Sequence, residues 1–371
     1  MNTPQSFEIF LAAPPGLESV LAEEARIKGF ADPTPTPGGV TVQGGWPEVW
    51  RANLELRGAG KVLARVGGFM AFHLAQLDKR SRKFPWGDIL RPDMPVRVEV
   101  TCAKSKIYHA GAAAQRIEKA ITEELGAAIS PEAEICIKTR IIDNNVTFSI
   151  DTSGEPLHKR GHKEAVGKAP MRETLASMFL RQCGYDGIEP VVDPMCGSGT
   201  FVIEAAEIAA GLAPGRTRSF AFERLASFDP ALWAQMRAAG QGHVPAQRFY
   251  GADRDAGAVR MSRANAERAG VTAFCDFECH AFADLTPPDG PPGLVMVNPP
   301  YGGRIGNKKL LYGLYAGLGE VLATRFKGWR VGMITSEASL AKASGLPFKP
   351  MAPPVAHGGT KVWLFHTGRL K

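Results

Sequence analysis

The stretch Val191-Val192-Asp193-Pro194-Met195-Cys196-Gly197-Ser198-Gly199-Thr200 decides the fold class of this sequence. A short apolar run ends in an acid and is followed by a glycine turn and a helical pattern over 200–210. Glycines let a backbone approach a ligand closely, and a helix N-terminus offers N–H groups to an anion. The stretch therefore predicts a ligand-binding loop between a buried strand and a helix. A helix-capping turn without a ligand fits the same residues.

Strands and helices alternate around this loop. Helices are predicted over 173–183, 200–210 and 256–269, and strands over 190–193, 247–253 and 293–297. This alternation predicts a doubly wound α/β fold whose site lies at the C-terminal ends of parallel strands. The segment 213–246, which contains Trp233, is interpreted as an insertion.

The N-terminal half has a different pattern, in which short strands and helices mix and predict an α+β region. Strands are expected over 8–12, 39–42, 96–101 and 135–140, helices over 17–28, 61–77 and 110–125, and a hairpin around 143–145. The proline-rich segment 32–39 is expected to be a turn or loop. The polar, basic segment 151–170 has the composition of a linker.

The composition fits a protein of two or three domains. The chain has 371 residues, 44% hydrophobic and 22% charged, which excludes wholesale disorder. No apolar run reaches the ~18–20 residues of a membrane span, and no secretory signal is recognised, so we expect a cytoplasmic protein with reduced cysteines. The net charge of +7 favours a polyanionic partner, and residues 61–172 alone carry +6.

Two strand-end acids indicate the kind of ligand. Asp193 would repel a pyrophosphate but would pair with an ammonium group, such as that of S-adenosylmethionine. Asp253 ends the next strand, where an acid of this fold binds ribose hydroxyls; Asp255 is either a second adenosine contact or a helix N-cap. The predicted cofactor-binding residues are Asp193, Pro194, Met195, Cys196, Gly197, Ser198, Gly199, Thr200, Asp253 and Arg254.

The stretch Leu294-Val295-Met296-Val297-Asn298-Pro299-Pro300-Tyr301-Gly302 predicts the chemistry. A strand stops at Asn298, and two prolines fix the backbone behind it. The Asn298 side-chain carbonyl and the Pro299 backbone carbonyl are suited to accept both N–H bonds of an exocyclic base amine, while Tyr301 offers a stacking face. We therefore predict Asn298, Pro299, Pro300 and Tyr301 as the catalytic motif of an amine methyltransferase. A strand-terminating turn is the structural alternative.

Three segments together carry a resemblance: 157–176 (LHKRGHKEAVGKAPMRETLA), 193–200 (DPMCGSGT) and 298–306 (NPPYGGRIG). The chain resembles the bacterial THUMP-domain RNA methyltransferases (RlmL-like) that form N2-methylguanosine in 23S rRNA, a group also called N6-adenine-specific DNA methylases. The resemblance implies a ferredoxin-like subdomain over 1–60, a THUMP RNA-binding domain over 61–155, a basic linker over 156–172 and a seven-stranded Rossmann-like, class I methyltransferase domain over 173–371. It also implies S-adenosylmethionine as cofactor, 23S rRNA or a large-subunit precursor as partner, and a single modification.

The resemblance leaves the adenine contact open, because many relatives carry an Asp where this chain has Ala281. Asp284 or a backbone group is the candidate there. Cys275, Cys279 and His280 are too few to complete a metal site, so no metal is expected. Contacts to RNA are expected from the basic run 79–83, treated as a loop, from residues near 104, and from the linker; the candidates are Lys79, Arg80, Arg82, Lys83, Lys104, Lys106, Lys159, Arg160 and Lys163.

Two other functions fit the same residues. The motif at 298–301 recognises an amine rather than a base, so an N6-adenine methyltransferase acting on RNA or DNA remains an alternative. A non-catalytic RNA-binding assembly factor is the second, although the presence of Asp193, Asp253 and Asn298 together disfavours it. A nicotinamide dehydrogenase is disfavoured because the loop lacks the three-glycine spacing of dinucleotide sites.

Overall fold

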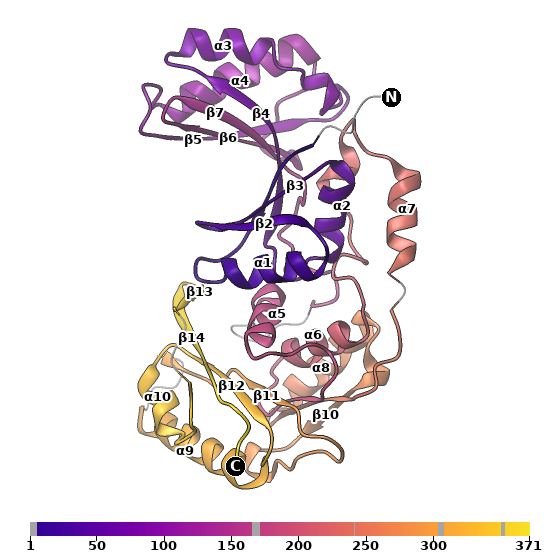
Figure 1. Ribbon diagram of the computed structural model, residues 1–371, viewed down its shortest axis with the longest axis vertical. Coiled ribbons are helices and arrows are strands. Elements are labelled where there is room, and N and C mark those ends of the chain that lie inside the picture. The colour runs from indigo at the N-terminus through magenta and orange to yellow at the C-terminus, as the bar shows by residue number, and fades with distance from the viewer. Residues whose placement is uncertain (1–5, 165–170, 241, 303–307, 350–352) are drawn as a thin grey trace. The chain divides into compact units, whose positions relative to one another are not determined.

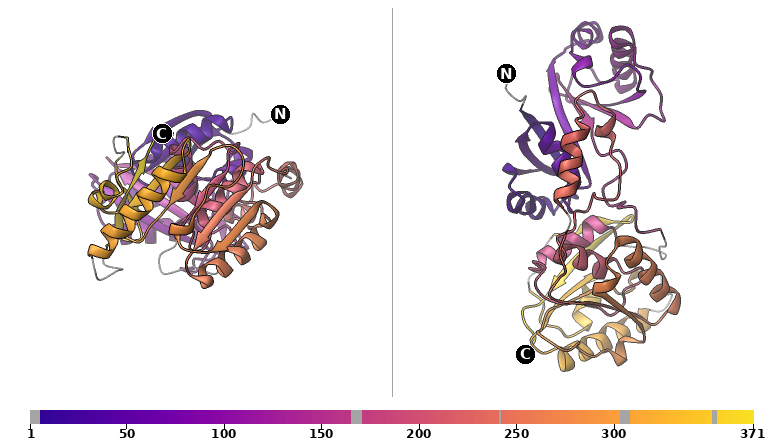
Figure 2. Two further views of the ribbon diagram at one scale, coloured as in Figure 1. Left: turned by 90° about the horizontal axis from the view of Figure 1, so that it is seen from below. Right: turned by 90° about the vertical axis from the view of Figure 1, so that its right-hand side faces the viewer.

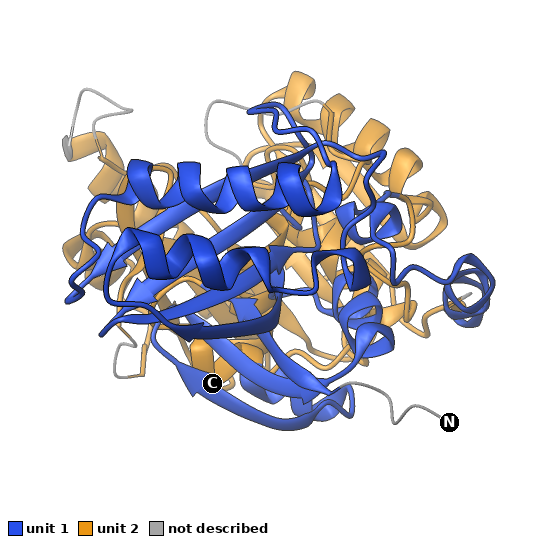
Figure 3. Cartoon of the chain, turned by 90° about the horizontal axis from the view of Figure 1, so that it is seen from above, with its two compact units in different colours: residues 1–13, 22–157, 218–239 blue, residues 14–21, 158–217, 240–371 orange. Residues whose placement is uncertain are grey.

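The computed structural model describes residues 6–164, 171–240, 242–302, 308–349 and 353–371. It forms two compact units, each made of segments distant in sequence (Figure 3). Unit 1 comprises 1–13, 22–157 and 218–239, and unit 2 comprises 14–21, 158–217 and 240–371. Within the described part of the chain, no helix is long and apolar enough to span a membrane.

Unit 2 contains a seven-stranded sheet in the order β10-β9-β8-β11-β12-β14-β13. Five neighbouring strands are parallel, and the hairpin of β13 and β14 adds two antiparallel strands at one edge. The strands are β8 (Val191–Asp193), β9 (Phe249–Asp253), β10 (Cys275–Cys279), β11 (Leu294–Val297), β12 (Arg330–Thr335), β13 (Val355–His357) and β14 (Thr360–His366). The predicted α/β fold with a mostly parallel sheet is confirmed.

Helices cover both faces of this sheet, as Figures 1 and 2 show. They are α5 (Glu173–Gln182), α6 (Thr200–Ala209), α8 (Ala256–Ala269), α9 (Lys308–Arg325) and α10 (Ala338–Ala343). The short central strands β8 and β11 are buried along their whole length, because helices exclude water from both faces of the sheet. The predicted helices at 173, 200 and 256 and the strands at 190, 247 and 293 are therefore confirmed to within a few residues.

Unit 1 contains a second seven-stranded sheet, in the order β2-β3-β1-β4-β7-β6-β5. All pairs are antiparallel except β5 with β6. The strands are β1 (Phe7–Ala12), β2 (Ala31–Thr36), β3 (Gly39–Gly44), β4 (Lys61–Met70), β5 (Val96–Ala103), β6 (Ile135–Ile142) and β7 (Asn145–Asp151), and the helices are α1 (Glu18–Ile27), α2 (Trp46–Glu55), α3 (Leu74–Arg82) and α4 (Ala110–Leu125).

Two expectations for this half were wrong. Residues 61–70 form β4 rather than a helix, because β4 pairs with both β1 and β7 and so joins the two parts of one sheet across the predicted boundary at residue 60. Residues 31–36 form the edge strand β2 rather than a loop. Prolines are tolerated there because an edge strand leaves one row of N–H positions without a ladder partner. The hairpin at 143–145 is confirmed, with Asp143 and Asn144 at positive φ.

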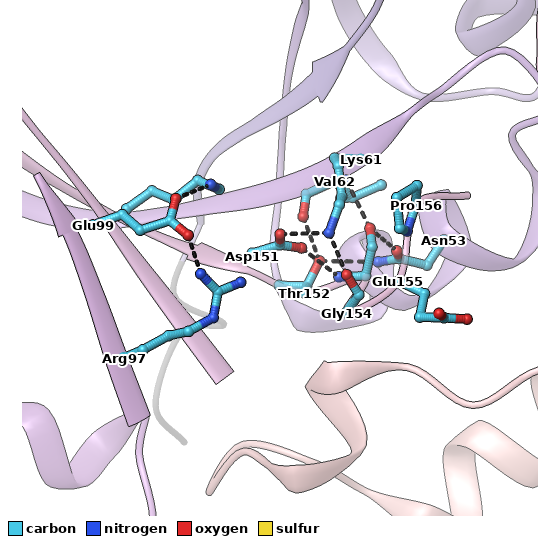
Figure 4. Close-up of polar contacts among 12 residues, drawn as sticks. Asn53, Lys61, Val62, Arg97, Glu99, Asp151, Thr152, Gly154, Glu155 and Pro156 are labelled. Atoms are coloured by element: carbon cyan, nitrogen blue, oxygen red, sulfur yellow. Dashed lines mark hydrogen bonds and ion pairs between the residues drawn. The ribbon is translucent and has the colours of Figure 1, made fainter. Parts of the chain in front are cut away.

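Polar contacts fix the end of this sheet (Figure 4). The Asp151 carboxylate at the end of β7 lies 2.7 Å from Lys61 Nζ at the start of β4, and Asn53 Nδ2 donates to Thr152 Oγ1 over 3.0 Å. Near the outer edge, Glu99 pairs with Lys138 and with Arg97, and these contacts, chiefly that with Lys138, lower the pKa of Glu99 to about 2. The charge of the Lys138 ammonium is thus balanced by the Glu99 carboxylate on the neighbouring strand.

The predicted insertion lies between α6 and β9, and most of it belongs to unit 1. It contains a 3-10 turn at Ala221–Arg224 and the helix α7 (Pro230–Ala239). Phe222 is fully buried: its ring stacks on Trp50 of α2 at 5.9 Å and meets the edge of Trp233 at 5.0 Å. An aromatic cluster thus holds the insertion in the core of unit 1, and the chain of unit 2 is interrupted there.

Candidate active site

A cavity of about 390 Å³ opens in unit 2 at the C-terminal ends of β8, β9 and β11. That volume is typical of a small-molecule site. The cavity is lined by Met171, Asp193, Pro194, Met195, Cys196, Gly197, Ser198, Thr200, Phe201, Asp253, Arg254, Ala281, Phe282, Asn298, Pro299, Pro300 and Leu314. The structure thus brings the glycine loop (residues 193–200) and the Asn298 motif to one cavity, although 105 residues separate Asp193 from Asn298.

The glycine loop turns sharply from β8 into α6. Gly197 and Gly199 have φ of +55° and +81°, a left-handed conformation that L-residues with a Cβ rarely adopt. Two side chains of α8 hold the loop carbonyls: Ser262 Oγ donates to Gly197 O at 2.9 Å, and Asn265 Nδ2 donates to Ser198 O at 3.0 Å. Helix α8 thus binds two carbonyl groups of the loop, while residues 193–198 of the loop line the cavity. Gly199 itself does not line the cavity but supports the turn.

Asp193 is a buried carboxyl group on the cavity wall. Its Oδ1 accepts the Met195 N–H at 3.0 Å. Burial, with a smaller contribution from the Asp253 carboxylate, raises the pKa of Asp193 to about 8. A cationic group within the cavity would reverse this effect by favouring the charged carboxylate. Without such a group, the buried Asp193 side chain is protonated at neutral pH.

Asp253 stands at the end of β9 and connects this strand to the glycine loop that follows β8. Its Oδ2 accepts the Gly197 N–H at 3.1 Å, and its Oδ1 accepts the Asp255 N–H at 2.9 Å. Asp255 is the N-cap of α8 and accepts from Gly257 N at 2.7 Å, so its structural interpretation holds. Ala281 and Phe282 line the cavity beyond β10, whereas Asp284 is absent from the lining set among the described residues.

Asn298 directly follows β11, and its side chain lines the cavity. Among the described residues, its Oδ1 has no hydrogen-bond partner although the atom is buried. An unpaired buried carbonyl costs roughly 1–3 kcal/mol, so a ligand donor at this position would gain a preformed acceptor. Pro299 and Pro300 line the cavity next to it. Tyr301 does not: its side chain is only 4% exposed, so the expected open stacking face is absent from this arrangement.

Cys196 lines the cavity as a buried thiol. Its Sγ lies 3.6 Å from Ser262 Oγ, and burial raises the pKa of Cys196 well above its usual range. The thiol therefore stays protonated at neutral pH and serves as packing rather than as a nucleophile. Within the described ranges, no group of three or more His, Cys, Asp or Glu side chains is placed to hold a metal ion.

The predicted RNA-binding role of Arg160 and Lys163 is corrected by their burial. Arg160 pairs with Glu204 of α6 at 3.1 Å, with both side chains 1% exposed. Lys163 Nζ donates to Met171 O at 2.6 Å and lies 3.3 Å from Glu173 Oε1. The described part of the linker thus packs into unit 2 around the cofactor loop. Lys159 remains exposed and stays a candidate.

The basic run 79–83 lies on and just after helix α3, not in a loop. Arg82 is neutralised by three carboxylates, those of Asp78, Glu123 and Glu124, which raise the pKa of Arg82. A contact of Arg82 with RNA would have to compete with these three carboxylates, so its RNA-binding role stays a prediction. Lys79, Arg80 and Lys83 line a surface hollow together with His73 and Gln76.

Sequence reasoning missed several cavity residues, namely Met171, Phe201, Phe282 and Leu314. Met171 and Phe201 flank motifs that were recognised, so proximity in sequence could have suggested them. Phe282 and Leu314 carry no local signal, because only the strand order brings the segments after β10 and β11 to this cavity.

The strand order, the cavity at the C-terminal strand ends and the Asn298 motif define a methyltransferase domain. Residues 160–350 match the family model described as "RMKL-like, methyltransferase domain", and residues 8–63 match "RlmL ferredoxin-like domain". The first match covers more than half of the chain. This chain belongs to the RMKL-like methyltransferase family.

Three similar proteins support this assignment. The chain is 35% identical over 368 residues to the ribosomal RNA large subunit methyltransferase K/L of Syntrophotalea carbinolica, covering 93% of this chain and 51% of that protein. It is 30% identical to a Synechocystis sp. protein named "Putative RNA methyltransferase", covering 93% and 92%. A crystal structure described as "a putative methyltransferase complexed with SAH" has a TM-score of 0.88 at 27% identity, covering 100% of both chains. The chain spans about half the length of its K/L relatives.

Proposed function

We propose that this protein transfers a methyl group from S-adenosylmethionine to the exocyclic N2 amine of a guanine in 23S rRNA. The observation that carries the proposal is the buried, unpartnered Oδ1 of Asn298 among the described residues, located on the same cavity wall as the glycine loop. A buried acceptor atom without a donor is suited to accept a hydrogen bond from a substrate N–H.

The residues of the cavity fit the cofactor. Asp193 is a buried carboxyl group that would ionise next to the amino-acid ammonium, and Asp253 stands at the strand end where ribose hydroxyls bind in this fold. Met171, Phe201 and Phe282 add apolar surface for the adenine and thioether parts. When bound, S-adenosylmethionine supplies an electrophilic methyl group.

The chain's own residues orient the amine. Its nitrogen is a weak nucleophile because the lone pair is delocalised into the ring. Asn298 Oδ1 and Pro299 O accept its two N–H bonds, which favours a tetrahedral nitrogen with the lone pair directed into the cavity. The two prolines keep these acceptors fixed, so little ordering is needed when the base arrives. The chain offers positioning and hydrogen bonding rather than a strong base.

An RNA substrate is supported by charge and by the relatives. Residues 61–172 carry +6, and Lys79, Lys83, Lys104, Lys106 and Lys159 keep exposed or partly exposed ammonium groups. The K/L relatives are named as ribosomal RNA methyltransferases. We assign the THUMP-like RNA-binding role to residues 61–155 and place the reaction in the cytoplasm, where ribosomal subunits assemble.

The substitution Asn298→Ala tests the chemistry. We expect loss of methyl transfer to rRNA with unchanged affinity for S-adenosylhomocysteine, because the residues that would hold the cofactor belong to the glycine loop and the end of β9 rather than to the 298–300 motif. Turnover is measured with radiolabelled cofactor, and affinity by calorimetry. Thermal unfolding of the variant checks that its fold is intact. An undiminished rate would remove Asn298 from the mechanism.

The base is identified by comparing rRNA nucleosides from cells with and without the gene by mass spectrometry. Loss of one N2-methylguanosine supports the proposal. Loss of an N6-methyladenine would instead favour the adenine methyltransferase. An unchanged nucleoside profile, together with an assembly defect, would favour a non-catalytic RNA-binding factor.

A further inference from the structure

Helix α3 of unit 1 carries cations on two faces with different surroundings. Arg82 lies toward α4, where Glu123 and Glu124 neutralise it. Lys79, Arg80 and Lys83 line a surface hollow with Gln76, at helical spacings of three and four residues. Among the ion pairs of the described residues, none involves Lys79 or Lys83. One face of α3 therefore keeps its positive charge available for a partner.

Two aromatic side chains are exposed just before helices α3 and α4. Phe72 is 40% exposed and precedes α3 by two residues, and Tyr108 is 84% exposed and precedes α4 by two residues. The Lys106 ammonium lies 5.6 Å from the centre of the Phe72 ring. Aromatic rings are usually buried in the protein core, so an exposed ring in contact with a lysine indicates a binding surface. Tyr108 lies two residues from that lysine in the chain.

The hairpin between β6 and β7 holds the two segments together. Asn144, at φ +63°, accepts the Lys106 N–H through its Oδ1 at 2.8 Å and the Ala71 N–H through its carbonyl at 2.9 Å. The Phe72 N–H donates to Gln76 Oε1 at 2.9 Å, and this bond links the backbone of Phe72 to a residue that lines the hollow on α3. Phe72, Lys106 and the hollow on α3 are thus joined by hydrogen bonds into one surface, and Tyr108 follows Lys106 by two residues.

We propose that this aromatic-basic surface (Phe72, Lys79, Arg80, Lys83, Lys104, Lys106 and Tyr108) binds an unpaired segment of the RNA substrate. Lysines and arginines contact phosphates, and the rings stack on bases, which are accessible only where the strand is not paired. A duplex buries its base faces and would use the cations alone. The inference rests on the proposed RNA substrate and specifies which form of RNA unit 1 selects.

Binding of fluorescently labelled 12-nucleotide RNA tests the proposal, with the single strand and its duplex compared by anisotropy on the full chain without cofactor. We expect the single strand to bind at least about tenfold more tightly than the duplex. Tyr108→Ala and Phe72→Ala should each weaken single-strand binding by roughly fivefold to 100-fold, as loss of one stacked base predicts, and leave duplex binding unchanged. Tyr108→Phe keeps the ring and should retain affinity.

Ile27→Ala is the matched control, because Ile27 is an exposed apolar residue of unit 1 outside the surface. The double variant Lys79→Gln/Lys83→Gln should lower the slope of log affinity against log salt by about 0.7 for each lost phosphate contact. Equal binding of single strand and duplex, or full affinity in Tyr108→Ala, overturns the inference. Methyl transfer is measured separately, so a failed binding result is distinguishable from a failed catalytic proposal.

Discussion

Arg160 and Glu204 form an ion pair of 3.1 Å in which each side chain is only 1% exposed. Arg160 comes from the segment expected to be a basic linker, and Glu204 from the mostly apolar helix α6 that follows the glycine loop. A charge on an apolar helix is tolerated when a partner reaches it. The pair attaches the segment before the catalytic domain to the helix that supports the cofactor loop.

Breaking this pair is expected to destabilise unit 2 strongly. Arg160→Met leaves the Glu204 carboxylate buried without its cation, and such losses cost about 3–5 kcal/mol. Denaturant unfolding of the variant measures the cost. Lys159→Met removes a neighbouring but exposed cation and should change the free energy of unfolding by less than about 0.5 kcal/mol. Similar small effects at both positions would contradict the buried pair.

The raised pKa of Asp193 predicts a pH-dependent affinity for the cofactor product. Below about pH 8 the unliganded carboxyl is protonated, and an ammonium favours its charged form, so binding of S-adenosylhomocysteine releases a proton there. Affinity should rise with pH up to about 8. Calorimetry in buffers of different ionisation enthalpy measures the released proton. Asp289→Asn, an exposed acid, should keep this dependence, whereas Asp193→Asn should abolish it.

The same shift determines how stability varies with pH without ligand. The folded-state pKa of about 8 lies above the ordinary value of 3.8, so between these values the folded chain binds a proton that the unfolded chain has lost. The contribution of Asp193 to the free energy of unfolding therefore declines as pH rises through about 8. Asp193→Asn should make the unliganded protein more stable than wild type at pH 9, as thermal unfolding would show. A less stable variant at that pH would oppose the assignment.

Gly199→Ala is expected to weaken cofactor binding more than its cost in stability implies. Its φ of +81° disfavours a Cβ, and that Cβ would lie 3.1 Å from Ser262, whose hydroxyl holds the Gly197 carbonyl. Gly270→Ala is the control, since Gly270 has a similar φ of +72° but no heavy atom within 4 Å of the added Cβ. Both variants should lose about 1–2 kcal/mol of stability. Only Gly199→Ala should lower affinity for S-adenosylhomocysteine.

The aromatic cluster predicts that the insertion stabilises unit 1. Phe222→Ala removes a buried ring packed on Trp50 and Trp233 and should cost about 3–5 kcal/mol. Cofactor affinity should be retained, because no described cavity residue lies between 218 and 239. Tryptophan fluorescence during denaturation reports the loss. Val244→Ala, at an 80% exposed position, is the neutral comparison.

Local sequence was sufficient where the chemistry is local. The strand, glycine turn and helix at 191–210 were predictable because a buried apolar run, two glycines at positive φ and a helix start follow one another directly. The helix Ala110–Leu125 and the hairpin at Asp143-Asn144 were predictable for the same reason. The expectation for 61–77 failed because β4 is stabilised by pairing with β1 and β7, which lie far from it in sequence.

The sequence by itself determined the glycine loop and the Asn298 motif, since each consists of residues adjacent along the chain, and it indicated the α/β fold class through the alternation of strand and helix patterns. Only the tertiary structure decided which charges face solvent. Arg82, Arg160 and Lys163 were indistinguishable from Lys79 in composition, yet carboxylates on other elements neutralise them. The burial of Tyr301 and the inclusion of Phe222 in unit 1 were decided in the same way, because burial depends on the packing of segments distant in sequence.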